Sequence, residues 1–352
     1  MFNNKMDLLN YVGLSEEKKR KLRIQSYLDS LLSDDEKTNN KYKMVSISPL
    51  RYAGGKSRAV GYILEHLPEN IDNKIVSPFF GGGSFEFALS ANLDFEIIGY
   101  DIFEILVNYW YFQINKPQEL YEELRLLIPD KKNYTRNRHI LLHYWDKVKP
   151  ETLDYITRRK VQLTEEEKTM LDHNDLKRAA YYYYNHQLSY GPMFLGWGSS
   201  VYLNQNRYDI ILEKVKNFKA GNVTVKCDSF ENVFKKYKTD FIYADPPYYL
   251  EGDSKMFKGI YPNSNFAIHH KNFDHKLLRE LLRTHKGGFI ITYNDCSDIR
   301  EMYKDYEQYF PAWQYSYGQG ETRIGKNRLA KKKVNNIKKS HEIIIVCPPN
   351  DS

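Results

Sequence analysis

The sequence predicts an α/β fold built on a doubly wound, Rossmann-like sheet. Apolar runs typical of buried strands alternate with helical segments along the chain, and several of these runs end in an acid or a glycine turn. Such alternation is typical of sheets that bind ligands at the carboxyl ends of their strands. At 352 residues the chain can hold one large domain with a smaller inserted or appended one.

Composition narrows the function classes only modestly. A net charge of +7 favours a polyanionic partner, without distinguishing nucleic acid from other anions. The three cysteines are isolated, with neither zinc spacing nor a disulfide framework, which indicates a reducing compartment and no metal. No stretch has the apolar length of a membrane span, and no secretory signal is present. We therefore expect a cytoplasmic protein that binds no membrane.

Residues 1–46 predict a helical extension followed by a polar linker. Leucines and a tyrosine between Leu22 and Leu32 recur at roughly helical spacing, and Ser15 before Glu16 and Glu17 marks a helix start. We expect this extension to pack on the body of the protein. A DNA-binding arm is the alternative.

Two glycine-rich stretches predict a ligand site near the start of the sheet. Residues 52–56 read Tyr-Ala-Gly-Gly-Lys and do not form a phosphate-binding P-loop, because Leu50 stands where that motif requires glycine. The strand at 74–77 runs into Gly81, Gly82, Gly83 and Ser84 and then into a helix, and glycine lets a ligand approach the backbone closely. A dinucleotide fingerprint is the alternative, but Glu86 occupies its third glycine position.

Acids end two further predicted strands. The run 96–101 ends in Asp101, and the run 223–228 ends in Asp228, with Phe230 close behind. One carboxylate at a strand end can accept both hydroxyls of a ribose. A ribose-binding acid beside an incomplete dinucleotide loop favours S-adenosylmethionine, which has a ribose but no phosphate. An acid that merely ends a strand in a turn is the alternative.

The segment after the apolar strand 241–244 predicts the catalytic chemistry. It reads Asp245-Pro246-Pro247-Tyr248, and its prolines make the backbone stiff and extended. The carboxylate of Asp245 and the carbonyl of Pro246 both accept hydrogen bonds, so together they can hold the two hydrogens of a planar amine. Such acceptors favour the positive charge that develops as the amine attacks, while Tyr248 can stack on a base. A proline-rich surface turn is the alternative.

Residues 245–248 resemble the catalytic signature of amino-methyltransferases that act on DNA, and residues 52–56 resemble the first cofactor motif of DNA adenine methyltransferases of the Dam type. The resemblance covers residues 48–348, and its motif order, with the cofactor motifs first and the catalytic motif last, is that of the α class. It implies a methyltransferase sheet that ends in an antiparallel pair and carries an inserted, mainly helical DNA-recognition domain. It also implies methyl transfer from S-adenosylmethionine to the N6 amine of adenine in duplex DNA, with the base flipped out.

The resemblance assigns roles residue by residue. It places catalysis on Asp245, Pro246, Pro247 and Tyr248. It places cofactor binding on Tyr52, Lys56, Gly81, Gly83, Ser84, Asp101, Asp228, Phe230 and Asp245. It divides the chain into an extension and linker (1–46), a catalytic domain (47–114 and 202–352) and a target-recognition insertion (115–201). The implied partner is double-stranded DNA. A companion restriction endonuclease and an orphan regulator without one are alternatives that the sequence leaves open.

DNA contacts are expected in two places. Asn185 and Tyr190 match a turn that lies beside the DNA in the resembling family, although Pro192 and Met193 depart from its pattern. A basic run before the last strand predicts a loop that orders on phosphates, with contacts from Arg323, Lys331, Lys332 and Lys333. A solvated loop is the alternative for this run. For the whole chain the alternatives are methylation of the cytosine N4 amine or of RNA, and a catalytically silent protein that binds nucleic acid.

Overall fold

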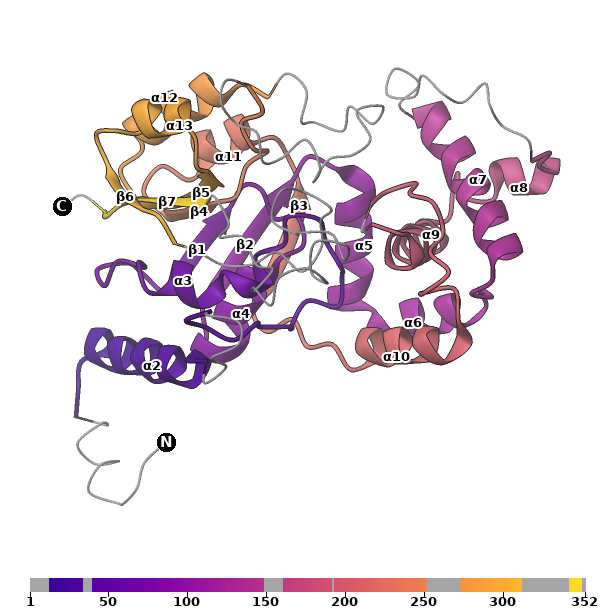
Figure 1. The fold of residues 1–352 in the computed structure, drawn as a ribbon, viewed down its shortest axis with the longest axis horizontal. Helices are drawn as coiled ribbons and strands as arrows, with labels where there is room; N and C mark the ends of the chain where they lie inside the picture. The colour runs from indigo at the N-terminus through magenta and orange to yellow at the C-terminus, as the bar shows by residue number, and fades with distance from the viewer. Residues whose placement is uncertain are drawn as a thin grey trace, which may run out of the picture.

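A seven-stranded mixed sheet forms the centre of the protein (Figure 1). The computed structural model describes residues 13–33, 40–148, 161–191, 193–251, 273–311 and 342–349. The strand order is β3-β2-β1-β4-β5-β7-β6; the first five strands are parallel, and β7 runs antiparallel to β5 and β6. The predicted α/β class is confirmed, and the sheet ends in the expected antiparallel pair.

All of the strands except the short, polar β6 lie where apolar runs predict them, and β6 was not predicted. Their bounds are β1 Lys74–Ser77, β2 Glu96–Asp101, β3 Val223–Cys227, β4 Phe241–Ala244, β5 Phe289–Asn294, β6 Glu307–Tyr309 and β7 Glu342–Cys347. Every residue of β4 and β5 is buried, because these strands lie in the middle of the sheet. Edge strand β3 is mostly exposed and alternates polar with apolar residues. The carboxyl ends of the five parallel strands therefore meet at one edge of the sheet.

The two faces of the sheet bury separate hydrophobic clusters. Along β4, Phe241 and Tyr243 join one cluster and Ile242 and Ala244 join the other, as the alternation of side chains along a strand requires. The first cluster takes in residues of α3 (Val60–Leu64), α4 (Ser84–Leu93) and α5 (Glu104–Asn115), and the short helix η1 (Lys56–Arg58) precedes α3. The second takes in residues of α11 (Phe230–Lys236), α12 (His275–Thr284) and α13 (Ser297–Met302).

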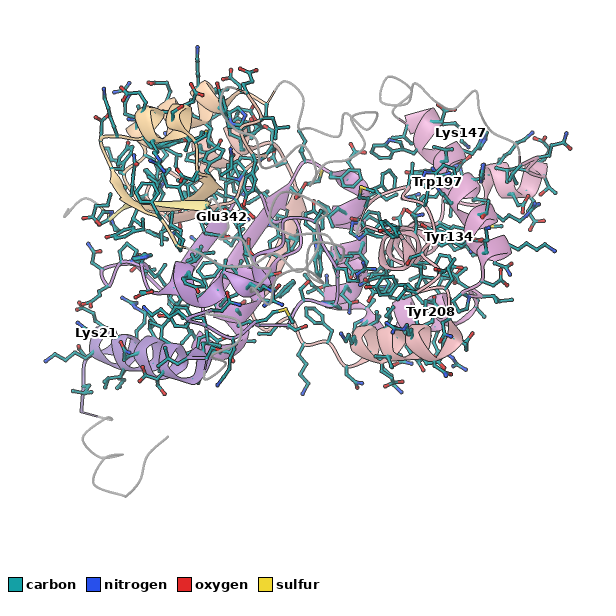
Figure 2. The ribbon with its side chains drawn as sticks, in the orientation of Figure 1. Lys21, Tyr134, Lys147, Trp197, Tyr208 and Glu342 are labelled. Atoms are coloured by element: carbon teal, nitrogen blue, oxygen red, sulfur yellow. The ribbon has the colours of Figure 1, made fainter. Side chains whose placement is uncertain are left out.

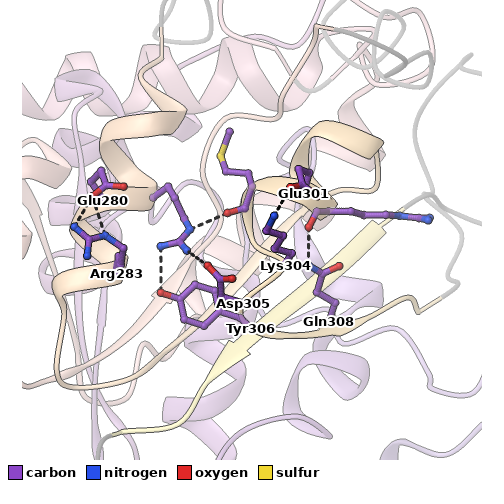
Figure 3. A network of polar contacts seen from close by, with 10 residues as sticks. Glu280, Arg283, Glu301, Lys304, Asp305, Tyr306 and Gln308 are labelled. Atoms are coloured by element: carbon purple, nitrogen blue, oxygen red, sulfur yellow. Dashed lines mark hydrogen bonds and ion pairs between the residues drawn. The ribbon is translucent and has the colours of Figure 1, made fainter.

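A polar network joins α12, α13 and β6 at the antiparallel end of the sheet (Figure 3). The guanidinium of Arg279 donates to the Met302 carbonyl at 2.8 Å and to the Asp305 carboxylate at 3.0 Å. Gln308 of β6 donates to the Arg300 carbonyl at 2.9 Å. Because Arg279 is buried and holds a backbone carbonyl, it fixes α12 against the turn after α13.

Five further helices lie beside α5, on the β3 side of the sheet (Figure 1). They are α6 Pro117–Arg125, α7 Lys131–Val148, α8 Glu165–Thr169, α9 Asp175–Leu188 and α10 Gln205–Lys216. Helix α9 lies in their midst, and its residues 179–188 are all buried. Its four consecutive tyrosines are buried on different sides; Tyr183, for example, stacks on Tyr109 of α5 with ring centroids 5.1 Å apart. Encirclement by other helices explains why α9 carries more aromatic residues than one core face requires.

Helix α10 belongs with this helical group although the predicted insertion ends at residue 201. The Tyr208 hydroxyl donates to the Leu124 carbonyl at the end of α6, at 2.8 Å, and the ring of Tyr208 is buried (Figure 2). Tyr208 lies on the buried face of α10. The sequence can predict that a helix has a buried face, but it cannot predict which other helix that face packs against. The helical group therefore extends to about the end of α10.

The N-terminal part forms a helix that packs on the body. Helix α2 spans Glu16–Leu31, and Ser15 caps it as predicted, accepting from the Lys18 amide at 3.4 Å. Ion pairs join Lys21 to Glu69 at 2.7 Å and Arg23 to Asp94 at 3.2 Å. Leu31 at the end of the helix is buried in the core. Among the described residues, no helix combines the length and the apolar character needed to cross a bilayer.

Candidate active site

The segment Asp245–Tyr248 leaves β4 at the carboxyl edge, in the middle of the sheet. Strand β4 ends at Ala244, and the prolines prevent it from continuing, as the sequence predicts. The Asp245 carboxylate accepts a hydrogen bond from the Thr292 hydroxyl of the neighbouring strand β5 at 2.8 Å. The Nζ atom of Lys56 lies 2.7 Å from each carboxylate oxygen. Asp245 is thus held from two sides while its side chain keeps 22% of its surface exposed.

Lys56 is a buried cation at the centre of the site. Its side chain is 3% exposed, and besides Asp245 its ammonium donates to the Tyr248 hydroxyl at 2.8 Å and to the Gly54 carbonyl at 3.0 Å. An ammonium group has three hydrogens to donate, and Asp245, Tyr248 and Gly54 offer an acceptor for each. The structure therefore places Lys56, predicted to contact a cofactor, on the catalytic segment itself.

Strand β7 holds Tyr248, which the sequence predicts to be catalytic, through Glu342. The Tyr248 hydroxyl donates to the Glu342 carboxylate, whose two oxygens lie 2.9 and 2.8 Å away. Glu342 is the first residue of β7 and is 1% exposed; Figure 2 shows it in the part of the molecule that contains the sheet. The ring of Tyr248, predicted to stack on a base, is itself buried with its hydroxyl held between Lys56 and Glu342.

Asn294 fixes the backbone immediately after Tyr248. It pairs with Glu342 across the β5–β7 ladder. Its amide oxygen accepts from the Tyr249 N–H and its amide nitrogen donates to the Tyr249 carbonyl, both at 2.8 Å. The paired residues Asn294 and Glu342 therefore hold Tyr249 and Tyr248, respectively.

Sequence reasoning missed Thr292, Asn294 and Glu342 as site residues. A signal was present: all three are polar residues in otherwise apolar, buried strands, and a buried polar group needs a hydrogen-bond partner. Thr292 and Asn294 are also two positions apart, so they lie on the same face of β5.

The glycine loop after β1 lies against Tyr52. Gly81 and Gly83 have φ values of +48° and +62°, in the left-handed region that favours glycine, and a Cβ on Gly83 would lie 2.6 Å from the Phe87 ring. A Cβ on Gly82 would lie 2.6 Å from the Cβ of Tyr52, so this tyrosine rests directly on the loop. Ser84 begins α4 directly after the loop.

Asp101 ties the glycine loop to the end of β2. Its two carboxylate oxygens accept from the backbone amides of Gly81 and Phe103, each at 2.9 Å. Burial raises the pKa of Asp101, while these amides oppose the shift. Since each carboxylate oxygen has a second acceptor position, Asp101 retains the capacity to accept further hydrogen bonds. The structure thus brings together Tyr52, Gly81 and Asp101, as the sequence predicts.

Asp228 and Phe230 follow β3, the strand next to β2. The Asp228 amide donates to the Asp101 carbonyl at 3.3 Å, which places the two strand ends side by side. A hydrogen bond from Asn232 lowers the pKa of Asp228. Phe230 packs with Phe79 and Phe273, with ring centroids 5.5 and 5.2 Å away. These three partly buried phenylalanines form an aromatic cluster beside the acids.

Of the residues predicted to contact DNA, Asn185 and Tyr190 lie in different environments. Asn185 is 1% exposed: its amide nitrogen donates to the Tyr134 hydroxyl at 2.9 Å, and its oxygen accepts from the Leu195 amide at 2.7 Å. It supports the loop after α9 from inside and presents no surface to a ligand. Tyr190, in contrast, is 68% exposed. Arg323, Lys331, Lys332 and Lys333 lie outside the described residues.

A short hairpin after α9 displays Tyr190 next to Trp197. Ser189 and Gly198 form an antiparallel bridge, and the Tyr190 amide donates to the Trp197 carbonyl at 2.7 Å. Trp197 is 69% exposed, and the Arg138 guanidinium lies 4.4 Å from the centre of its ring (Figure 2). Sequence reasoning left Trp197 without a role, because neither its exposure nor its place beside Tyr190 follows from the local pattern.

Comparison with known proteins identifies the family. Residues 52–317, most of the chain, match the family model described as D12 class N6 adenine-specific DNA methyltransferase. The matched range includes the glycine loop, the strand-end acids, the exposed hairpin and the segment 245–248. No curated protein sequence matches the chain.

Proposed function

Because the chain belongs to the D12 class N6 adenine-specific DNA methyltransferases, we propose that it transfers a methyl group from S-adenosylmethionine to an adenine flipped out of duplex DNA. The observation that carries this proposal is the fixed Asp245 carboxylate at the carboxyl end of β4, held by Lys56 and Thr292. A target amine within a base stack is inaccessible to such a carboxylate, which is why the base must leave the helix.

Several features support S-adenosylmethionine as the methyl donor. The left-handed glycine loop allows close approach to the backbone, Asp101 has spare acceptor positions for ribose hydroxyls, and the phenylalanine cluster offers aromatic faces to an adenine ring. When bound, this cofactor supplies an electrophilic methyl group on a cationic sulfur. We propose that the residues holding it are Tyr52, Gly81, Gly83, Ser84, Asp101, Asp228 and Phe230.

The protein's own residues act on the target amine. The Asp245 carboxylate and the Pro246 carbonyl accept the two amine hydrogens, which orients the nitrogen and stabilises the positive charge that develops on it during attack. Lys56, Thr292 and Glu342 act through Asp245 and Tyr248, because their hydrogen bonds fix these residues before the base arrives. Attack is direct and requires no covalent enzyme intermediate.

The reaction and its substrate can be tested together. We expect the purified chain, incubated with methyl-labelled S-adenosylmethionine and duplex DNA, to yield N6-methyladenine after digestion to nucleosides. RNA and a DNA substrate lacking adenine serve as controls. Label in N4-methylcytosine would indicate that cytosine is the target. Label found only in RNA would indicate an RNA methyltransferase. No labelling of any nucleic acid would contradict the proposal. Sequencing for modified bases in cells that express the chain would give the recognition sequence.

The helical group α6–α10 supports our division of the chain. We propose that residues 115–201, together with α10, form a target-recognition insertion in a doubly wound, Rossmann-like catalytic domain. Residues 1–46 form an extension on that domain. A role in a restriction–modification system, with a companion endonuclease acting on the same cytoplasmic DNA, is compatible with site-specific adenine methylation and is part of this proposal; an orphan regulator is the alternative.

The exposed hairpin is our proposed DNA contact. Replacing Trp197 with alanine should weaken DNA binding about 5- to 150-fold, because stacking of a base on an aromatic side chain contributes about 1–3 kcal/mol. Replacing Tyr190 should have an effect of the same order. Fluorescence anisotropy with a short duplex would measure both.

A matched control is available for the hairpin variants. Phe310 is 52% exposed and follows β6, at the opposite edge of the sheet from the helical group, so Phe310→Ala should leave DNA binding unchanged. Equal affinities for the wild type and both hairpin variants would exclude the hairpin from the DNA interface.

A further inference from the structure

A buried carboxyl group that the proposed reaction does not use lies beneath the catalytic segment. Glu86 stands in the first turn of α4, just after the glycine loop, and is 3% exposed. The hydroxyl of Ser77, the last residue of β1, donates to its Oε1 atom at 2.7 Å. Because β1 pairs with β4, the Ser77–Glu86 pair lies at the same edge of the sheet as Asp245.

Charged groups of the segment 245–248 and its partners lie around this pair. Asp245 and Lys56 are the charged groups that face Glu86 closely enough to change its pKa. Burial raises the pKa of Tyr243 on β4, and the carboxyl groups of Asp245, Glu86 and Glu342 raise it further, so all three carboxyls lie around this one residue. Ionising Glu86 would therefore place its charge in a low-dielectric interior close to the Asp245 carboxyl.

Burial favours the protonated form of Glu86, whose side chain is almost wholly withdrawn from solvent. Burial raises the pKa of Glu86 to about 8, and the charge on Asp245 adds to the rise, while Ser77 and Lys56 oppose it. Asp245 and Glu342, in contrast, share the ammonium of Lys56 directly or through the Tyr248 hydroxyl. Near neutral pH Glu86 is therefore mostly a neutral carboxylic acid.

We propose that Glu86 keeps its proton while no methyl donor is bound and releases it to solvent when the cationic sulfonium cofactor binds. This inference rests on the proposed function. A positive charge brought to this edge of the sheet favours the ionised form of a nearby carboxyl. The thioether product lacks that charge, so Glu86 regains its proton once the methyl group has been transferred. The site thereby binds the charged donor in preference to its uncharged product, which favours product release.

Calorimetric titration without DNA tests the proposal. S-adenosylmethionine and S-adenosylhomocysteine are each titrated into the protein near neutral pH, in two buffers of different ionisation enthalpy, which reports the protons released. We expect the donor to release up to about one proton more from the wild type than from Glu86→Gln, and the product to show no such difference. Taking the difference between variants removes the titration of the ligand's own amino group, which falls in the same pH range. Glu96→Gln, at the exposed opposite end of β2, is the matched control and should release protons as the wild type does.

The pH dependence gives a second readout. Donor affinity should rise up to about tenfold per pH unit toward pH 8 and then flatten in the wild type, and this component should be missing in Glu86→Gln. Ser77→Ala removes a hydrogen bond that favours the ionised form of Glu86, so the pH at which donor affinity stops rising should be higher in this variant. This variant keeps the proposal testable if Glu86→Gln fails to fold. Equal proton release by the wild type and Glu86→Gln would overturn the proposal. If neither ligand binds, the proposed function itself is wrong. If the protein methylates DNA but donor binding releases no proton from Glu86, only the present inference is wrong.

Discussion

Replacing Asp245 with alanine should abolish DNA methylation, with kcat falling by at least about 10²–10³-fold, the loss associated with removing one preorganised group that stabilises developing charge. The variant loses the acceptor that orients the amine and opposes its positive charge. Single-turnover assays with labelled cofactor would measure the loss, with DNA affinity determined separately. Lys56 retains Tyr248 and the Gly54 carbonyl as partners, so we expect the folded state to persist.

The control for this variant is Asp29→Ala, an exposed aspartate on α2, which should methylate as the wild type does. The diagnostic pattern is a fall in kcat with DNA binding nearly unchanged. Turnover by Asp245→Ala comparable to the wild type would remove Asp245 from catalysis and with it the proposed mechanism.

Replacing Lys56 with methionine should lower the free energy of unfolding by about 3–5 kcal/mol, because removing the ammonium breaks its ion pair with Asp245 inside the protein. Asp245 loses its ion pair, and Glu342 loses the cation that reaches it through Tyr248. Catalysis should fall as well, since Asp245 is then held by Thr292 with no cation beside it. Urea unfolding monitored by circular dichroism would measure the change in stability.

A double variant separates charge from packing in this prediction. If the cost arises from the carboxylate that loses its ion pair, adding Asp245→Asn to Lys56→Met should restore part of the lost stability, and the two substitutions should not be additive. Lys18→Met, at an exposed position on α2, controls for loss of a lysine charge and should change stability by less than about 0.5 kcal/mol. A loss below about 1 kcal/mol for Lys56→Met would show that the ammonium does not hold the site together.

The sequence by itself determined the strands and the chemistry at their ends. Apolar runs such as 241–244 and 289–294 identify buried strands, because their composition is a local property that burial in the sheet requires. The two prolines after Asp245 end β4 through their own covalent geometry. The glycine loop and Asp101 meet as predicted, since the carboxyl ends of adjacent parallel strands lie at one edge.

Only the tertiary structure decided which groups hold the catalytic segment. Lys56 precedes Asp245 by 189 residues, and Glu342 follows Tyr248 by 94. The register of β5 against β7 places Asn294 opposite Glu342, and pairing across a sheet is not encoded in either strand alone. Asn185 has a local setting that suits a DNA contact, yet its fold neighbours Tyr134 and Leu195 bury it. A side chain's type is a property of the sequence, but its partners depend on which distant segments the fold brings within hydrogen-bonding distance.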